Sequence, residues 1–314
     1  MKSGLWILIA VMIAGIFVGY VVKDRIKPPA PADEQAQLKA IGEMSDSEAK
    51  ILRLEAFVTD HPKSEEKSQA YSMIAKEMLG ALKDTTRFVG FARQAIEKES
   101  DPESKALMYY RLYNLKADNK PEEAALIGTE LLKVPVDASW VYNYIGYDLA
   151  SRGRDLELAL ALCGKAVELA KDASDSSAAL DSRGFTYYRK GMYGESVADL
   201  ERAVALSPEP DVEIVNHLAD AYLANGETQK GFDSFRQVLV TGEYEHAREA
   251  IDSLMTAERY SPVKRSRFEE SLWQDRIDRS KPAIAFTLPT LEGATFEFQP
   301  GSGDIFVLNF MSPT

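Results

Sequence analysis

The feature that most constrains this chain is a segment that recurs three times between residues 139 and 242. The intervals between the glycines that end the copies, Gly153, Gly191 and Gly226, are 38 and 35 residues. A helix–turn–helix unit with a period near 34 residues predicts a solenoid, in which each unit packs on its neighbours. The copies align without gaps in their helix-forming parts: WVYNYIGYDLASRG from Trp140, AALDSRGFTYYRKG from Ala178 and EIVNHLADAYLANG from Glu213.

Within each copy, the apolar residues follow helical spacing. In the second copy, Leu180, Gly184 and Tyr187 are spaced so that they share one stripe of a first helix. Gly184 offers no side chain at the point where a second helix must approach closely. The glycine that ends each first helix favours a positive φ, so we expect a short turn and a second helix to follow.

At these positions the chain resembles the tetratricopeptide repeat family, over about 100 residues. The resemblance implies stacked helix pairs whose first helices line an inner face that binds a protein or peptide partner. The Lys/Asn set with which some members of the family grip a C-terminal carboxylate is missing, so that activity is not expected.

In the family's register, the inner face combines aromatic with hydrogen-bonding side chains. Such a surface suits an extended peptide or a partner helix. The alternative is that the aromatic residues pack against neighbouring repeats or the C-terminal segment. The expected groove residues are Trp140, Asn143, Tyr147, Asp181, Phe185, Tyr188, Arg189, Asn216 and Asp220.

The regions that flank the three copies also have helical patterns. Residues 34–138 are interpreted as helical hairpins, either degenerate repeats that extend the solenoid or a helical spacer, and residues 243–279 as a helical connector. A repeat stack needs neighbours to cover its ends, which favours degenerate repeats. The expected helices are 49–58, 68–82, 87–98, 105–117, 121–132, 247–256 and 263–277.

The N-terminal segment, residues 1–33, has the pattern of a membrane anchor followed by a Pro-rich linker. Residues 5–22 contain no charge, and this uncharged run is about as long as a membrane-spanning helix needs to be. A cleaved signal peptide is the alternative, but no small-residue cleavage site follows the apolar run. We therefore expect residues 5–22 to lie in the lipid bilayer as a single-pass anchor.

The orientation of this anchor is contested by two signals. Lys23, Arg25 and Lys27 follow the span, and positive charge there favours a cytoplasmic location for the rest of the chain. The large acidic domain and the resemblance of the C-terminus, described below, favour export. We expect the bulk of the chain to lie outside the cytoplasmic membrane, in the periplasm.

Composition excludes some classes of function. The formal net charge is −12, so a nucleic-acid partner is not expected, because phosphate binding needs a basic face. The one cysteine, Cys163, cannot form an internal disulfide and stands where the repeat expects an apolar residue, which predicts a buried, inert thiol. The histidines show no metal-ligand spacing, and no phosphate-binding loop is present, so no catalytic residue, metal or cofactor is predicted.

The pattern changes from helix to strand in residues 280–314. Residues 285–289 and 295–298 alternate as strands around a turn, and residues 305–310 form a near-continuous apolar run typical of a buried parallel strand. This order resembles the opening of membrane-tethered thioredoxin-like thiol–disulfide oxidoreductases and of the AhpC/TSA redoxins. The resemblance is carried by Pro282, Phe286, Leu288, Leu291, Gly293, Val307, Leu308, Asn309 and Phe310.

In those families a Cys-x-x-Cys motif follows, opening a helix that stabilises the reactive thiolate. Thr314 stands where the residue before the first of these cysteines belongs. We therefore expect this domain to be truncated and the chain as given to have no redox activity.

Together these patterns predict a mainly α protein: a tetratricopeptide-type α-solenoid, preceded by one transmembrane helix and followed by an incomplete α/β thioredoxin-like segment. The first functional hypothesis is an anchored scaffold that tethers a thioredoxin-like domain and binds proteins through its repeats. The second is a non-enzymatic interaction or assembly scaffold whose C-terminal segment is a remnant.

Overall fold

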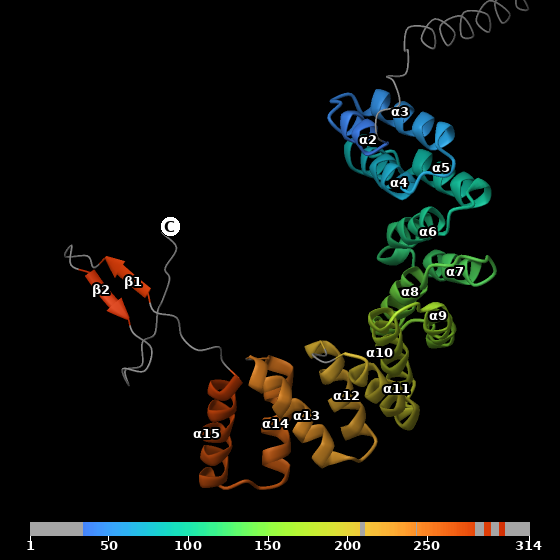
Figure 1. Cartoon of the computed structure of the whole chain (residues 1–314). Helices are drawn as coiled ribbons and strands as arrows, with labels where there is room; N and C mark the ends of the chain where they lie inside the picture. Colours follow the sequence, from blue (N-terminus) through green and yellow to red (C-terminus); the bar gives the residue numbers. More distant parts are fainter. Residues whose placement is uncertain (1–33, 208–210, 243, 280–285, 290–294, 299–314) are drawn as a thin grey trace, which may run out of the picture. The chain divides into compact units, whose positions relative to one another are not determined.

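The computed structural model describes residues 34–207, 211–242, 244–279, 286–289 and 295–298. These residues are mainly helical (Figure 1), as the spacing of apolar residues predicts. The chain divides into two compact units, Met1–Met192 and Tyr193–Thr314, so the boundary falls inside the second sequence copy. The predicted division into domains at residues 33, 138, 242 and 279 stays a prediction.

The first unit begins with helices that sequence patterns predict in part. Acidic N-caps start three of them: the side chains of Asp46, Asp84 and Asp101 accept hydrogen bonds from backbone N–H groups in the first turns of α3, α5 and α6. Proline opens α6 and α7, where its missing N–H is not needed. The helices are α2 (Glu34–Gly42), α3 (Ser47–Asp60), α4 (Lys67–Lys76), α5 (Thr85–Lys98), α6 (Pro102–Ala117) and α7 (Pro121–Leu131).

The helix predicted over residues 68–82 is present, but its second half is a π-helix and not an α-helix. After α4 the chain continues as a π-helical turn, η1 (Glu77–Ala81), closed by a hydrogen bond from the N–H of Leu82 to the carbonyl of Glu77. The Glu77 carboxylate also accepts hydrogen bonds from Ser47 and Lys50 of α3, at 2.6 and 2.9 Å. In this region α3 packs on α4, and α5 packs on α6 and on η1.

A buried ion pair holds this N-terminal region together. Lys67 Nζ lies 2.6 Å from Glu99 Oε1, and both side chains are almost completely buried. Lys67 also donates to the carbonyl of Pro62, and the Tyr71 hydroxyl donates to Glu99. Burial disfavours the charge on Glu99 and acts to raise its pKa. Hydrogen bonds from the backbone N–H of Asp101, from Lys67 and from the backbone N–H of Ser100 outweigh this effect, so the pKa of this carboxyl is lowered.

The first sequence copy folds as predicted, as the helix hairpin α8 (Ser139–Ser151) and α9 (Leu156–Leu169), and it is followed by α10 (Ala173–Arg189). Gly146 lies where the two helices of the hairpin meet. A Cβ atom there would stand 2.6 Å from the Sγ of Cys163 and 3.1 Å from the carbonyl oxygen of Ala159. Only a residue without a side chain permits this close approach.

The glycines that end the three first helices have the backbone conformation that the sequence predicts. Gly153, Gly191 and Gly226 have φ values of 65°, 76° and 82°. This left-handed region is easily reached only by glycine, so each of these residues ends a helix and starts a turn.

Successive first helices of the first unit are joined by a polar network. The hydroxyl of Tyr113 on α6 donates to Asp148 on α8 at 2.6 Å. Arg152 then bonds Asp148 and also Asp118 at the end of α6, both within 2.9 Å. The network ties a predicted degenerate repeat to the first clear copy, and one continuous core cluster extends from Leu38 to Ala179.

The second unit contains the remaining helices. Its core forms around α13, which packs on α12, α14 and α15. Gly231 on α13 lies against Leu223 on α12, where an added Cβ would stand 2.4 Å from a leucine methyl group. The helices are α11 (Tyr193–Ala205), α12 (Val212–Ala224), α13 (Thr228–Thr241), α14 (Glu245–Ala257) and α15 (Pro262–Arg279).

The two predicted strands are present as β1 (Phe286–Pro289) and β2 (Thr295–Phe298), which pair antiparallel (Figure 1). The register sets Phe286 opposite Phe298 and Leu288 opposite Phe296. The third predicted strand, residues 305–310, lies outside the described residues. A two-stranded pairing occurs in many folds, so the thioredoxin-like assignment stays a prediction.

The predicted membrane anchor at residues 5–22 also lies outside the described residues. Within the part of the chain that the structure describes, no helix combines the length and apolar character needed to cross a bilayer.

Candidate protein-binding face

The nine predicted groove residues are divided between the two units. Seven lie on α8 and α10 of the first unit, whereas Asn216 and Asp220 lie on α12 of the second. Trp140 and Arg189 are exposed, and the others are half-buried except for Asp181, which is only 8% exposed. Asp181 is thus a buried residue of α10, and its role in the groove stays a prediction.

Aromatic contacts link α8 to α10. The rings of Tyr147 and Phe185 lie 5.4 Å apart, and the ring of Tyr188 stacks on Phe185 at 6.4 Å. The Arg189 guanidinium lies over the Phe185 ring at 5.7 Å and also donates to the carbonyl of Ser151. These residues thus pack between repeats, as the alternative interpretation predicts, and remain half-exposed, as the groove interpretation predicts.

A second aromatic group, which the sequence interpretation missed, surrounds Trp140. The ring of Tyr110 on α6 lies 5.8 Å from that of Trp140 and 4.7 Å from that of Tyr144, edge-to-face in both cases. Tyr144 is 38% exposed, and its hydroxyl donates to Asn114. One signal was available in the sequence, because Tyr110 precedes Tyr144 by 34 residues, one repeat length.

Two predicted groove residues hold buried polar atoms without a hydrogen-bond partner. Among the described residues, the side-chain oxygens Oδ1 of Asn143 and Asn216 accept no hydrogen bond. Both asparagines are the fourth residue of their sequence copy, so they occupy the same place on the first helix of two repeats. Buried polar atoms are nearly always paired in folded proteins, and such an exception calls for a ligand or another role.

Asp220, the ninth predicted residue, forms a polar contact within the second unit. His246 of α14 lies 2.9 Å from the Asp220 carboxylate. Burial raises the pKa of Asp220, although His246 and His217 act in the opposite direction. The contact joins α12 to α14, so Asp220 also has a structural role.

Cys163 is the buried thiol that the sequence predicts. It is completely buried under α8, and its Sγ lies 3.6 Å from the hydroxyl of Thr186. Burial raises the pKa of this thiol to about 12, although the Thr186 hydroxyl lowers it slightly. A thiol of this kind is not a nucleophile near neutral pH.

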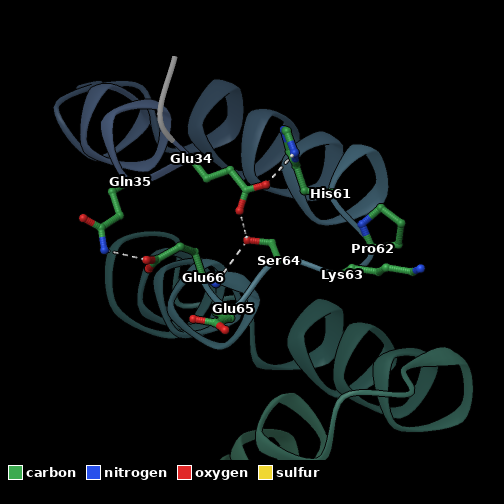
Figure 2. A pocket seen from close by; sticks show the side chains of 8 residues that line it. All are labelled: Glu34, Gln35, His61, Pro62, Lys63, Ser64, Glu65 and Glu66. Atoms are coloured by element: carbon green, nitrogen blue, oxygen red, sulfur yellow. Dashed lines mark hydrogen bonds and ion pairs between the residues drawn. The ribbon is translucent and has the colours of Figure 1, made fainter. Parts of the chain in front are cut away.

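The N-terminal end of the first unit contains an open polar pocket of about 490 Å³ (Figure 2). Glu34 of α2 bonds to Ser64 at 2.5 Å and lies 3.3 Å from His61, and Gln35 bonds to Glu66. Because these polar groups bind one another across the pocket, they fasten α2 to the loop after α3. Across the described residues, no group of three or more His, Cys, Asp or Glu side chains is placed to hold a metal ion.

The helix hairpins, the glycine-ended first helices and the close helix crossings define an α-helical repeat protein. The family model for the tetratricopeptide repeat matches residues 178–210, the sequence of α10 and α11. No curated protein matches the chain. The family match and the helical fold together support a tetratricopeptide protein, and repeats of this type generally form scaffolds for protein–protein interaction.

Proposed function

We propose that the first helices α8 and α10 of the first unit bind an extended protein segment from a partner. The observation that carries this proposal is the side-chain oxygen of Asn143 on α8, which has no hydrogen-bond partner among the described residues. An amide oxygen accepts hydrogen bonds, and an extended segment presents backbone N–H groups that need acceptors. Trp140 and Tyr147 belong to the same sequence copy as Asn143, and Tyr188 belongs to the next copy. Their aromatic rings add a kind of surface that is common where proteins contact one another.

This proposal is tested by selecting peptides from a random display library against the 314-residue chain and measuring their affinities. Asn143→Ala weakens binding of the selected peptides by about fivefold, because one net hydrogen bond contributes about 1 kcal/mol. Its melting temperature stays unchanged, since the oxygen that is removed has no partner in the unbound protein. Asn119→Ala, which changes an exposed asparagine in the turn after α6, leaves affinity unchanged.

If every selected peptide binds Asn143→Ala as tightly as the parent chain, the proposed face does not bind segments. An unchanged affinity together with a lowered melting temperature contradicts the proposal equally, because Asn143 then serves the fold alone.

The proposal includes a location for this scaffold, a single-pass anchor at residues 5–22 with the bulk of the chain outside the cytoplasmic membrane. The uncharged apolar run and the following Pro-rich linker support it. Alkaline carbonate extraction of membranes from expressing cells tests it, because an integral anchor keeps the chain in the pellet. Release of the chain into the supernatant, as expected after deletion of residues 5–22, contradicts the anchor.

The last part of the proposal concerns residues 280–314, interpreted as the start of a thioredoxin-like domain that the scaffold tethers. The pattern of apolar residues and the antiparallel pairing of β1 with β2 support it. Cys163 cannot supply the chemistry, because burial holds its pKa at about 12. The 314-residue chain therefore does not catalyse reduction of insulin disulfides by dithiothreitol, and measurable turnover would contradict this expectation. The second candidate, a non-enzymatic scaffold, rests on the same inner face.

A further inference from the structure

The aromatic group on α6 and α8 has a chemistry of its own, which we define by Tyr110, Trp140, Tyr144 and the neighbouring carboxylate of Glu103. We propose that this aromatic–acid site binds a lysine or arginine side chain of the partner segment. The inference rests on the proposed function of the inner face, to which it adds the charge of the ligand.

The site combines two features that attract a cation. Trp140 and Tyr144 are 36% and 38% exposed, the ring faces of aromatic residues attract cations, and tryptophan does so most strongly. The indole Nε1 of Trp140 donates to Glu103 at 2.9 Å, so a carboxylate stands at the edge of the ring. Within the described part of the chain, no lysine or arginine forms a salt bridge with Glu103, so this charge is available to a ligand.

Two arginines of the chain itself show that aromatic rings on α6 and α10 accept guanidinium groups. Arg111 lies 5.7 Å from the ring centre of Tyr110, and Arg189 lies at the same distance from that of Phe185. Among the described residues, no such cation lies over Trp140 or Tyr144. Arg111 already covers Tyr110, so a cation from the partner is directed to Trp140 and Tyr144.

The net charge of the whole molecule is negative, as is the charge of Glu103. With a formal net charge of −12, the chain attracts basic segments and repels acidic ones at long range. A basic ligand also distinguishes this site from a carboxylate-binding repeat, which needs basic residues in its groove.

The test follows the indole N–H signal of Trp140 by nuclear magnetic resonance in the 314-residue chain, assigned by its loss in Trp140→Phe. Three serine-rich peptides are added that differ only in carrying arginine, glutamine or glutamate at the same positions. The arginine peptide is expected to shift the signal with an affinity at least about fivefold above that of the glutamine peptide. The glutamate peptide is expected to leave the signal unchanged.

Two variants separate this site from general attraction to an acidic protein. Glu103→Gln and Tyr144→Leu each weaken binding of the arginine peptide by about threefold or more. Glu122→Gln removes the same charge from the exposed surface of α7 and leaves the affinity unchanged.

The inference is overturned if the arginine peptide does not shift the Trp140 signal, or if the glutamine peptide shifts it with equal affinity. Equal losses in Glu103→Gln and Glu122→Gln also overturn it, because the attraction is then not local. Each of these results leaves the role of Asn143 to be decided by the selected peptides, so failure of the two proposals is distinguishable.

Discussion

The α8–α9 hairpin and the α4–α5 region lie in the same helical unit but are held together differently. At the hairpin, Gly146 lets two helices approach until only a glycine fits, and the contact with Cys163 is wholly buried. In the α4–α5 region, the buried Lys67–Glu99 ion pair and a π-helical turn join helices that lack such a glycine crossing. The α8–α9 hairpin is therefore stabilised by shape, and the α4–α5 region by a particular set of polar contacts.

The largest expected effect tests the polar contacts of the α4–α5 region. Lys67→Met leaves Glu99 charged and buried without its cation, which lowers the free energy of unfolding by about 3–5 kcal/mol. Lys165→Met, which removes a solvent-accessible lysine paired with Glu168, leaves it almost unchanged, because solvent screens such a surface pair. Denaturant unfolding of both variants measures the difference, and equal small losses would show that the buried pair does not stabilise this region.

The next effect tests the close crossing of α8 and α9. Gly146→Ala places a Cβ atom 2.6 Å from the Sγ of Cys163 and lowers the free energy of unfolding by about 2 kcal/mol through over-packing. Gly164→Ala on α9, where an added Cβ meets no atom within 4 Å, stabilises the protein by about 0.5–1 kcal/mol. The same unfolding measurement applies, and a tolerated Gly146→Ala would contradict the account of the close crossing.

The smallest expected effect is on stability at low pH, and it tests the buried ion pair of the α4–α5 region a second time. The folded-state pKa of Glu99 lies below its unfolded value of about 4.3, so its contribution to stability is present above that pH and is lost as the pH falls through the folded pKa. Between about pH 6 and pH 3.5, the melting temperature of the parent therefore falls more steeply than that of Glu99→Gln. Parallel curves for the two proteins would show that Glu99 has the same pKa folded and unfolded.

Sequence reasoning succeeded where structure depends on local rules. Gly153, Gly191 and Gly226 ended helices as predicted, because glycine adopts a positive φ more easily than any other residue. The burial of Cys163 followed equally from its position in the repeat. The predicted helices of the second unit, residues 247–256 and 263–277, lie within α14 and α15.

The failures involve contacts between distant residues. The π-helical turn starts at Glu77, whose partners Ser47 and Lys50 lie about 30 residues earlier, beyond any local pattern. The burial of Asp181 depends on how α10 packs on its neighbours, which the register of one helix does not fix.

The candidate site was predicted only in outline. Its position on the first helices followed from the repeat, but Tyr110 lies on α6, outside the three clear sequence copies, where the sequence leaves the register open. The unpartnered oxygens of Asn143 and Asn216 are visible only when all neighbouring donors have been placed.

The most direct test of the central claim, that Asn143 accepts a backbone N–H from a bound segment, is a backbone N-methyl scan of a peptide selected against the chain. Methylation at one position is expected to weaken binding to the parent by about fivefold and to have no such effect on Asn143→Ala, a coupling of about 1 kcal/mol. If methylation at every position weakens binding equally in the parent and in Asn143→Ala, the asparagine does not hold the segment and the claim is contradicted.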